Sequence, residues 1–140
     1  MSDEFTTPDL VEVVTGLFEA ADRGDWGAVV KPYAPDCIWE DADGITDAVG
    51  ASEVRGFWEE WAGMFEDFKI TVETVVDLGK GIVFAVYHME GRPARSSTGV
   101  VTLRAALIYE WVDGMIKRLI VRQNIDEART AAEGLAESRR

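Results

Sequence analysis

The sequence is short of the residues from which most metal and nucleophilic sites are built. Its 140 residues contain one cysteine, Cys37, and one histidine, His88. A single cysteine cannot form a disulfide within the chain, and a single histidine excludes a site with several histidine ligands. Because Cys37 stands next to Ile38 and Trp39, we expect a small core residue there rather than a nucleophile. No metal-ligand spacing and no glycine-rich phosphate loop is present.

Long apolar runs and an excess of positive charge are also missing. No stretch is apolar over the length needed to cross a bilayer, and Met1 to Asp9 contains no basic segment followed by an apolar one. Fourteen basic residues against 26 acidic ones give a formal net charge of −12, which repels nucleic acid and anionic lipid. We expect a cytoplasmic protein that binds neither nucleic acid nor membrane.

The composition is that of one globular domain. Hydrophobic residues make up 47% of the chain and charged residues 29%, which argues against disorder. At this length, about two thirds of the surface of the unfolded chain can be buried in a single core. Since there is no internal repeat and no low-complexity segment, residues 1–140 are predicted to form one domain.

Helical spacing of apolar residues dominates the first half of the sequence. Thr7 is the expected N-cap of the first helix, Pro8 its first residue and Gly24 its end. A short second helix follows and is ended by Pro32. A third helix follows Ser52 and carries a strongly aromatic face.

The second half has the period of two that is typical of strands. Asp113 and Gly114 are a strong hairpin signal, and a terminal helix is expected near Asp126. The predicted strands are residues 36–41, 68–78, 82–90, 100–112 and 115–124, with turns or loops at 43–50 and 91–99. Helices segregated from antiparallel strands predict an α+β domain: a curved antiparallel sheet wrapped around the helices as a cone with an open mouth.

Several segments together resemble a known superfamily. Residues 17–26, followed by 33–36 and 39–41, resemble the opening of nuclear transport factor 2-like proteins, especially SnoaL-like polyketide cyclases and ketosteroid isomerases. Residues 111–118 and the tail at 126–135 are similar to the closing hairpin and tail of the SnoaL-like branch. The resemblance implies a cystatin-like cone, commonly a homodimer packed through the outer sheet face, and a small-molecule pocket without metal or organic cofactor.

The same resemblance implies roles for particular residues. Asp41 falls where ketosteroid isomerases keep the carboxylate that shuttles a proton, and Tyr33 falls where they keep a pocket tyrosine. Leu17 replaces the phenol that would stabilise the oxyanion, Trp58 replaces a second tyrosine, and Arg104 replaces a protonated acid. Steroid isomerisation itself is therefore not expected.

Asp41 has two interpretations from the sequence around it. At the end of an apolar strand, and on the same face as Cys37 and Trp39, its carboxylate would be partly desolvated and a better base near neutrality. Alternatively, Asp41 and Asp43 begin the turn before Gly44, where aspartate is a favoured residue.

Three further polar residues are catalytic candidates. Tyr87 and His88 alternate in one strand, so only one of them can line the pocket. Alignment with the resembled family at the turn 79–81 favours Tyr87, whereas a looser comparison with epoxide hydrolases, which hold a catalytic carboxylate on this strand, favours His88. Arg104 lies in an otherwise apolar strand, where it would hold an enolate or carboxylate oxygen, or alternatively lie on the outer face or at a dimer interface.

The pocket walls are expected to be apolar. Trp58 and Trp61 would either stack on a flat ligand or belong to the core, and Trp39 would lie beside Asp41. The resemblance adds pocket-lining positions on the last strand, which are Leu119, Val121 and Gln123.

We therefore predict a cofactor-free acid–base enzyme of the cyclase, isomerase or epoxide-opening type. Its substrate would be a small apolar carbonyl compound or epoxide, such as a polyketide or terpenoid. The alternatives are a non-catalytic small-molecule-binding module of the same fold and a domain that docks another protein on its outer sheet face.

Two expectations concern the surface. Val101, Leu103, Leu107 and Tyr109 are expected to form an apolar outer face, which predicts a homodimer. The tail from Gly134 onward is polar and terminal, so it is expected to contribute little to the core.

Overall fold

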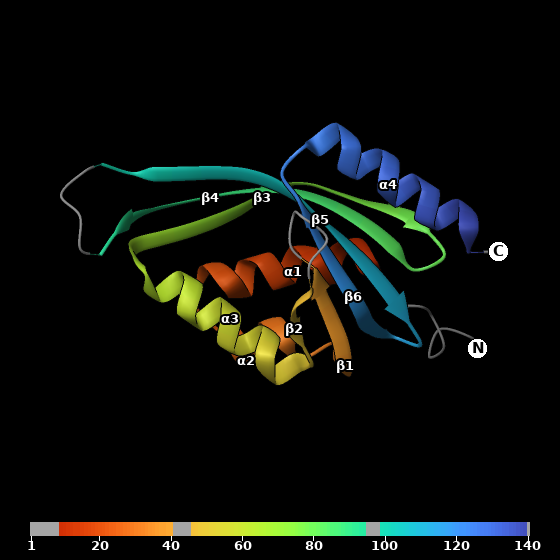
Figure 1. The fold of residues 1–140 in the computed structure, drawn as a ribbon, viewed down its shortest axis with the longest axis horizontal. Coiled ribbons are helices and arrows are strands. Elements are labelled where there is room, and N and C mark those ends of the chain that lie inside the picture. Colours follow the sequence, from red (N-terminus) through yellow and green to blue (C-terminus); the bar gives the residue numbers. More distant parts are fainter. Residues whose placement is uncertain (1–8, 41–45, 95–98, 140) are drawn as a thin grey trace.

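The computed structural model describes residues 9–40, 46–94 and 99–139, shown in Figure 1. In chain order its elements are α1 (Leu10–Asp22), α2 (Trp26–Val30), β1 (Tyr33–Glu40), β2 (Thr46–Val49), α3 (Ala51–Gly63), β3 (Phe65–Gly79), β4 (Ile82–Pro93), β5 (Val101–Val112), β6 (Met115–Arg122) and α4 (Ile125–Ser138). None of these helices is long and apolar enough to cross a membrane.

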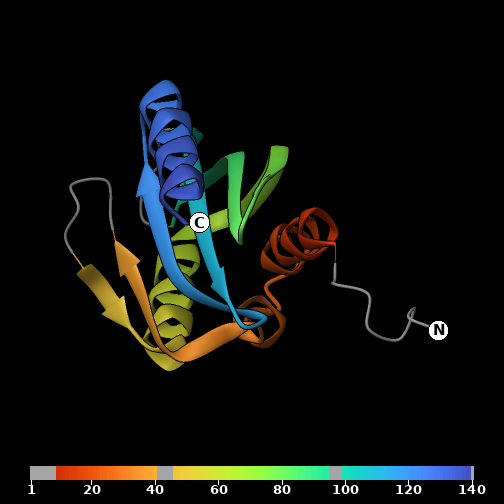
Figure 2. The ribbon, with the colours of Figure 1, turned by 90° about the vertical axis from the view of Figure 1, so that its right-hand side faces the viewer.

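All six strands described form one curved, unclosed sheet in the order β2-β1-β6-β5-β4-β3. Neighbouring strands are antiparallel except β1 and β6, which are parallel. Helices α1, α2 and α3 lie on the concave side of the sheet, and α4 crosses the opposite side (Figure 1). Figure 2 shows that β1 and β2 extend the sheet beyond β6. The predicted α+β class is confirmed.

Two tight turns fix the register of the four long strands. Lys80 has a φ of 58° between two glycines of positive φ, and Asp113 and Gly114 have φ values of 52° and 81°. Gly81 also approaches the neighbouring strand closely, because a Cβ atom there would lie 2.5 Å from the carbonyl oxygen of Trp111. Both hairpins predicted from glycine placement are confirmed.

The first helix begins later than its sequence suggested. Asp9 is its N-cap, and the Asp9 carboxylate accepts hydrogen bonds from the backbone N–H groups of Val11 and Glu12 at 3.0 and 3.4 Å. The predicted cap Thr7 and the predicted first residue Pro8 lie outside the described residues. Their assignment was wrong because the aspartate caps the helix two residues after Thr7.

Strand boundaries differ from the prediction at both ends of the sheet. β1 begins at Tyr33 rather than at Asp36, and it contains Pro35 where its register against β6 shifts, so that no ladder hydrogen bond from Pro35 is needed. Residues 46–49, predicted as part of a turn, form the edge strand β2. The loop predicted at 91–99 is shorter, since β4 continues to Pro93.

The sheet is covered on both faces, and each face has its own core. The inner core lies between the sheet and α1 to α3, and it includes Leu107 and Tyr109, which are almost fully buried. The outer core consists of sheet residues covered by alanines of α4, namely Ile82, Phe84, Val86, Ala106, Ile108, Ile120, Ala128, Ala132 and Ala136. Placing Leu103, Leu107 and Tyr109 on an outer apolar face was therefore wrong, and the homodimer stays a prediction without that support.

The C-terminal segment is fixed to the sheet rather than loose. Ala136 is buried, and the Arg139 guanidinium donates to the carbonyl oxygens of Lys80 and Trp111 at 2.9 and 2.8 Å and to the Glu110 carboxylate at 3.3 Å. Arg139 thus joins the β3–β4 turn to the end of β5. The expectation that the tail from Gly134 contributes little to the core was wrong, because α4 continues to Ser138.

The hydrogen bonds of Arg139 are expected to contribute measurably to the free energy of unfolding. Arg139→Ala leaves two carbonyl groups without their donor, so it should lower the free energy of unfolding by about 1–3 kcal/mol. The control is Arg23→Ala, which removes the same charge from an exposed side chain whose acidic neighbour is 3.9 Å away, with an expected change within about 0.5 kcal/mol. Urea unfolding measures both changes. Equal effects of the two variants would show that the contact adds no stability.

Candidate functional site

A continuous row of buried side chains forms the floor of the cone. Strand pairing brings Val83 of β4 next to Tyr109 of β5, and Tyr109 next to Leu119 of β6. The row continues through Trp39 of β1 to Ala48 of β2. All five side chains point to the concave face, where α1 to α3 cover them. This row connects the middle of the sheet to its open edge at β2.

Every tyrosine of the chain lies on this inner face. Tyr33, Tyr87 and Tyr109 come from three different strands, and their exposed fractions are only 4%, 4% and 3%. The Tyr87 ring packs at 5.5 Å from that of Phe18 on α1. Three phenols in one apolar interior are the main concentration of polar groups inside the described part of the cone, since no charged side chain is buried there.

Burial raises the pKa values of these phenols. It raises the pKa of Tyr87 to about 12 and that of Tyr33 still further. The pKa of Tyr109 is also raised, first by burial and then by the nearness of Tyr33 and Tyr87. The three hydroxyl groups are thus neutral hydrogen-bond donors at physiological pH, and none of them can act as a base there.

Helix α3 closes the cone with an aromatic wall. The ring centroids of Phe57 and Trp58 lie 5.2 and 5.4 Å from the ring centroid of Trp39 on the cone floor. Trp58 also stacks on Trp26 at 5.8 Å, and its indole N–H is buried with no hydrogen-bond partner in the described part of the chain. The Trp61 N–H donates to the Met89 sulfur at 3.3 Å, which fixes the orientation of the indole ring.

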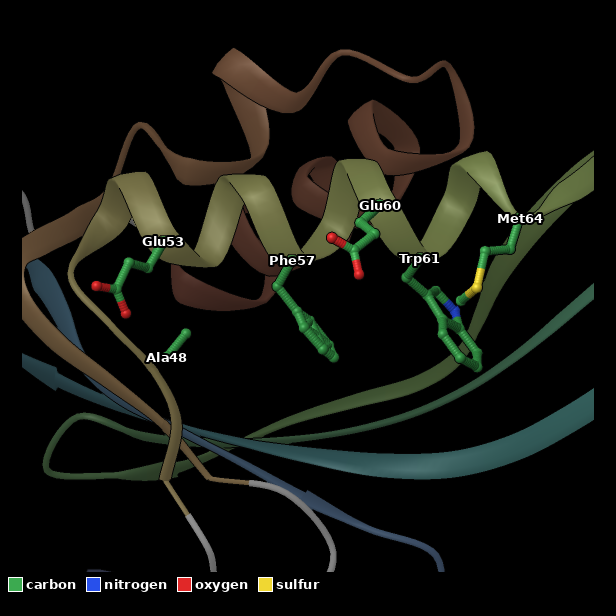
Figure 3. A pocket seen from close by; sticks show the side chains of 6 residues that line it. All are labelled: Ala48, Glu53, Phe57, Glu60, Trp61 and Met64. Carbon is green, nitrogen blue, oxygen red and sulfur yellow. The ribbon is translucent and has the colours of Figure 1, made fainter.

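A cleft of about 350 Å³ opens between α3 and the edge of the sheet (Figure 3). Figure 3 shows Phe57 and Trp61 pointing from α3 toward the sheet, with Met64 near the end of the helix. Its lining residues are Ala48, Glu53, Phe57, Glu60, Trp61 and Met64. Because Phe57 contacts Trp39 and Ala48 pairs with Trp39, the cleft adjoins the cone floor.

Side chains along β4 and β5 alternate between the two faces of the sheet, which separates the polar residues predicted to be catalytic. Tyr87 points into the inner core, whereas His88 pairs with Arg104 on the opposite side of the sheet. There the Arg104 side chain is 58% exposed and forms an ion pair of 2.9 Å with Glu73 of β3. The register of β3 shifts at Glu73, and the hydrogen bond from Arg104 lowers the pKa of that carboxyl below its usual value. The structure does not bring Arg104 or His88 together with Tyr87.

The other predicted site residues divide between the cone and its rim. Tyr33, Trp39, Trp58 and Leu119 are buried in the inner core, and Trp61 and Val121 pack against it while remaining partly exposed. Gln123 follows the end of β6 and is exposed. Asp41 lies outside the described residues, and it directly follows Glu40, the last residue of β1.

Sequence reasoning missed Tyr109 as a site residue. It was assigned to an outer face, although Leu119 had been expected in the pocket. The hairpin signal at Asp113 and Gly114 implies that Tyr109 pairs with Leu119 and shares its face, as the structure shows. Phe57, Glu53 and Glu60 of the cleft were also missed, because helical spacing alone does not distinguish a cleft from a packed core.

Among the described residues, no group of three or more histidine, cysteine, aspartate or glutamate side chains is placed to hold a metal ion. Cys37 is buried, as expected for a core residue, and burial raises the pKa of its thiol.

Several solved structures share this fold. A protein with a ketosteroid isomerase-like fold from Catenulispora acidiphila, in complex with trimethylamine, is 20% identical, with a TM-score of 0.69 over 92% of this chain and 95% of that one. A putative polyketide cyclase from Xanthomonas campestris is 20% identical, with a TM-score of 0.66 over 86% and 94%. An NTF2-like protein from Burkholderia thailandensis is 19% identical, with a TM-score of 0.71 over 94% and 98%.

Sequence comparison reaches the same family. A comparison with the curated proteins finds no match. The family model described as the SnoaL-like domain matches residues 14–119, which run from the middle of α1 to the inner face of β6. That span is well over half of the chain and includes the tyrosines, the aromatic wall and the cleft. This protein therefore belongs to the SnoaL-like domain family.

Proposed function

We propose that this protein is an acid–base enzyme of the cyclase or isomerase type that works on a small apolar carbonyl compound without a metal or organic cofactor. The observation that carries the proposal is the set of three neutral, buried tyrosines on the inner face of the sheet. Neutral donors in a dry interior stabilise a developing oxyanion strongly, because little solvent competes with them.

In the proposed step, the Asp41 carboxylate removes a proton from the carbon next to the substrate carbonyl. The electron pair of that C–H bond becomes the C=C bond of an enolate, and the carbonyl oxygen takes up the negative charge. Tyr87 donates a hydrogen bond to this oxygen, and Tyr109 is a second donor on the same face. For ring closure, the enolate carbon attacks a second carbonyl carbon of the substrate, the π electrons of that C=O bond move to its oxygen, and this oxygen takes the proton from Asp41. For isomerisation, a substrate with a conjugated C=C bond forms a dienolate, which regains the proton from Asp41 at the far end of the conjugated system.

Different observations support the roles given to Asp41 and Tyr87 in this proposal. Asp41 is assigned as the base by the family resemblance and by its position directly after β1. Tyr87 is preferred to Arg104 as the donor because Arg104 is paired with Glu73 on the other face of the sheet. His88 is excluded from the step for the same reason, since it pairs with Arg104 in the sheet.

A binding module is the second candidate function, and one observation favours it. No charged side chain is buried among the described residues of the cone, so the described interior alone contains donors and no base. If Asp41 does not act on the ligand, the same phenols and aromatic rings would hold a small molecule without changing it. The two functions differ in whether a proton is removed.

Proton abstraction can be measured without the natural substrate. Exchange of the α-protons of 2-tetralone in D₂O, followed by NMR, should be faster with the protein than in buffer. Asp41→Asn should slow the catalysed exchange by about 10²–10⁴-fold, because it removes the base, and Tyr87→Phe should slow it by about 10–10²-fold while keeping the ring that packs on Phe18. Asp43→Asn is the control of equal charge and should leave the exchange unchanged.

Two results would contradict the enzymatic proposal. One is binding of 2-tetralone with exchange no faster than in buffer, which is the behaviour of a binding module. The other is an equal loss of exchange in Asp41→Asn and Asp43→Asn, which would assign the effect to general charge rather than to a base. The melting temperature of each variant shows whether it remains folded.

The protonation state of the tyrosines predicts how the protein responds to alkali. Since their pKa values are raised in the folded state, the stability due to their neutral form is complete below the ordinary value of 10.0 and is lost as the pH rises toward about 12. Phenolate absorbance should therefore appear together with loss of the near-ultraviolet circular dichroism. A tyrosine that ionises reversibly near pH 10 in the folded protein would show that the phenols are not buried donors.

The family resemblance also implies a homodimer, and α4 limits where it can form. The helix covers the outer face over Phe84 and Ile108, so we propose that a second copy binds the uncovered part near Glu73, His88 and Arg104. Sedimentation velocity at micromolar concentration should show a dimer, and Arg104→Glu should dissociate it by placing like charges together. A monomer in the unsubstituted protein would refute this proposal.

A further inference from the structure

The cleft beside α3 combines aromatic rings with carboxylates. Phe57, Glu60 and Trp61 are neighbours on the helix at three- and four-residue steps, and Glu53 lies one turn before Phe57. In Figure 3 the Glu60 side chain leaves α3 between the attachment points of Phe57 and Trp61, and its carboxylate lies closer to the helix than the two rings do. The lining of the cleft therefore contains acidic as well as aromatic side chains.

The carboxylates of Glu53 and Glu60 differ in their hydrogen bonding to the rest of the protein. One Glu53 oxygen accepts a hydrogen bond from the backbone N–H of Val49 at 2.9 Å, which ties the end of β2 to α3. Glu59 forms an ion pair with Arg55 at 3.2 Å on another side of the helix. Glu60 has no such partner among the described residues. Its side chain is exposed on the helix, where the carboxylate is accessible to a ligand in the cleft.

The helix itself makes this position unfavourable for an acid. Glu60 lies in the last turn of α3, where the unpaired carbonyl groups carry partial negative charge, and that turn contains no basic residue. The described lining of the cleft contains no basic residue either. Among the described residues, no basic side chain of the cleft lining or of the last turn of α3 offsets the negative potential of Glu53, Glu60 and the helix end.

We infer that this cleft binds an organic cation, a protonated or quaternary ammonium group attached to an apolar body. The faces of Phe57 and Trp61 attract such a cation, and Glu60 and the end of α3 add electrostatic attraction. A divalent metal ion prefers several oxygen ligands, whereas half of this lining is aromatic rings and the thioether of Met64. The soft lining therefore selects an alkylammonium group over a metal ion.

Restraint of the two rings supports this assignment. The hydrogen bond to the Met89 sulfur restrains the Trp61 indole. Packing against Trp39, with the ring centroids 5.2 Å apart, restrains the Phe57 ring. Rings that are fixed before binding lose little conformational entropy when the ligand arrives. The net charge of −12 also raises the local concentration of cations around the protein. Cation binding at this cleft is independent of the proton transfer proposed for the interior.

Three probes of nearly equal shape test the inference. Choline is cationic, 3,3-dimethylbutan-1-ol is its neutral carbon isostere, and 3,3-dimethylbutanoate is an anion of similar size. The indole N–H signal of Trp61, identified among the five tryptophan signals by its loss in Trp61→Phe, reports binding in ¹⁵N NMR spectra. Choline should bind about tenfold more tightly than the alcohol, and the anion should bind most weakly.

Matched variants then locate the charge that matters. Glu60→Gln should reduce the preference for choline over the alcohol to about twofold or less, whereas Glu59→Gln, which removes the same charge one residue earlier, should leave it unchanged. Equal binding of choline and the alcohol would overturn the inference, and so would an equal effect of the two variants. Because Tyr87 is unchanged in these variants, failure here would leave the proposal of proton transfer to be judged by its own experiment.

Discussion

The structure depends on the covering of one sheet on both of its faces. Side chains of a strand alternate between the two faces, so a sheet with helices on each side needs apolar residues at consecutive positions. The central strands show this directly, since Ile82 to Tyr87 on β4 and Ala105 to Tyr109 on β5 are buried without a break. One set of these residues meets α1 to α3, and the other meets the alanines of α4.

Double coverage decides which groups meet inside the cone. Tyr87 and His88 are neighbours in sequence, yet one faces the helices and the other faces away from them. The tyrosines therefore gather in a dry interior, where their pKa values are raised, while Arg104 and Glu73 pair on the exposed face. The division gives the interior neutral donors and keeps the ion pairs outside. An interior of this kind suits a reaction in which negative charge develops on a substrate oxygen.

Much of the fold could be predicted because it depends on local signals. Helical spacing, the glycines of two hairpins and the strand period predicted the element order and the α+β class. The faces of β4 and β5 could not be assigned in the same way, since unbroken apolar runs carry no alternation that distinguishes the two sides. Leu107 and Tyr109 were misplaced for this reason, and so was the covering role of α4, whose alanines give a weak apolar signal.

Only part of the candidate site was predicted. Tyr33, Trp39, Trp58 and Leu119 were expected in the pocket and lie in the inner core, whereas Tyr109 and the carboxylates of the cleft were missed.

We propose that the reacting oxygen of a ligand meets the inner-face tyrosines. A crystal structure with 2-naphthol, which imitates an enolate, tests it most directly. We predict that the naphthol oxygen lies within the cone at hydrogen-bond distance from a hydroxyl group of Tyr87 or Tyr109. Naphthol bound on the outer face near His88 and Arg104, with the cone empty, would contradict the account.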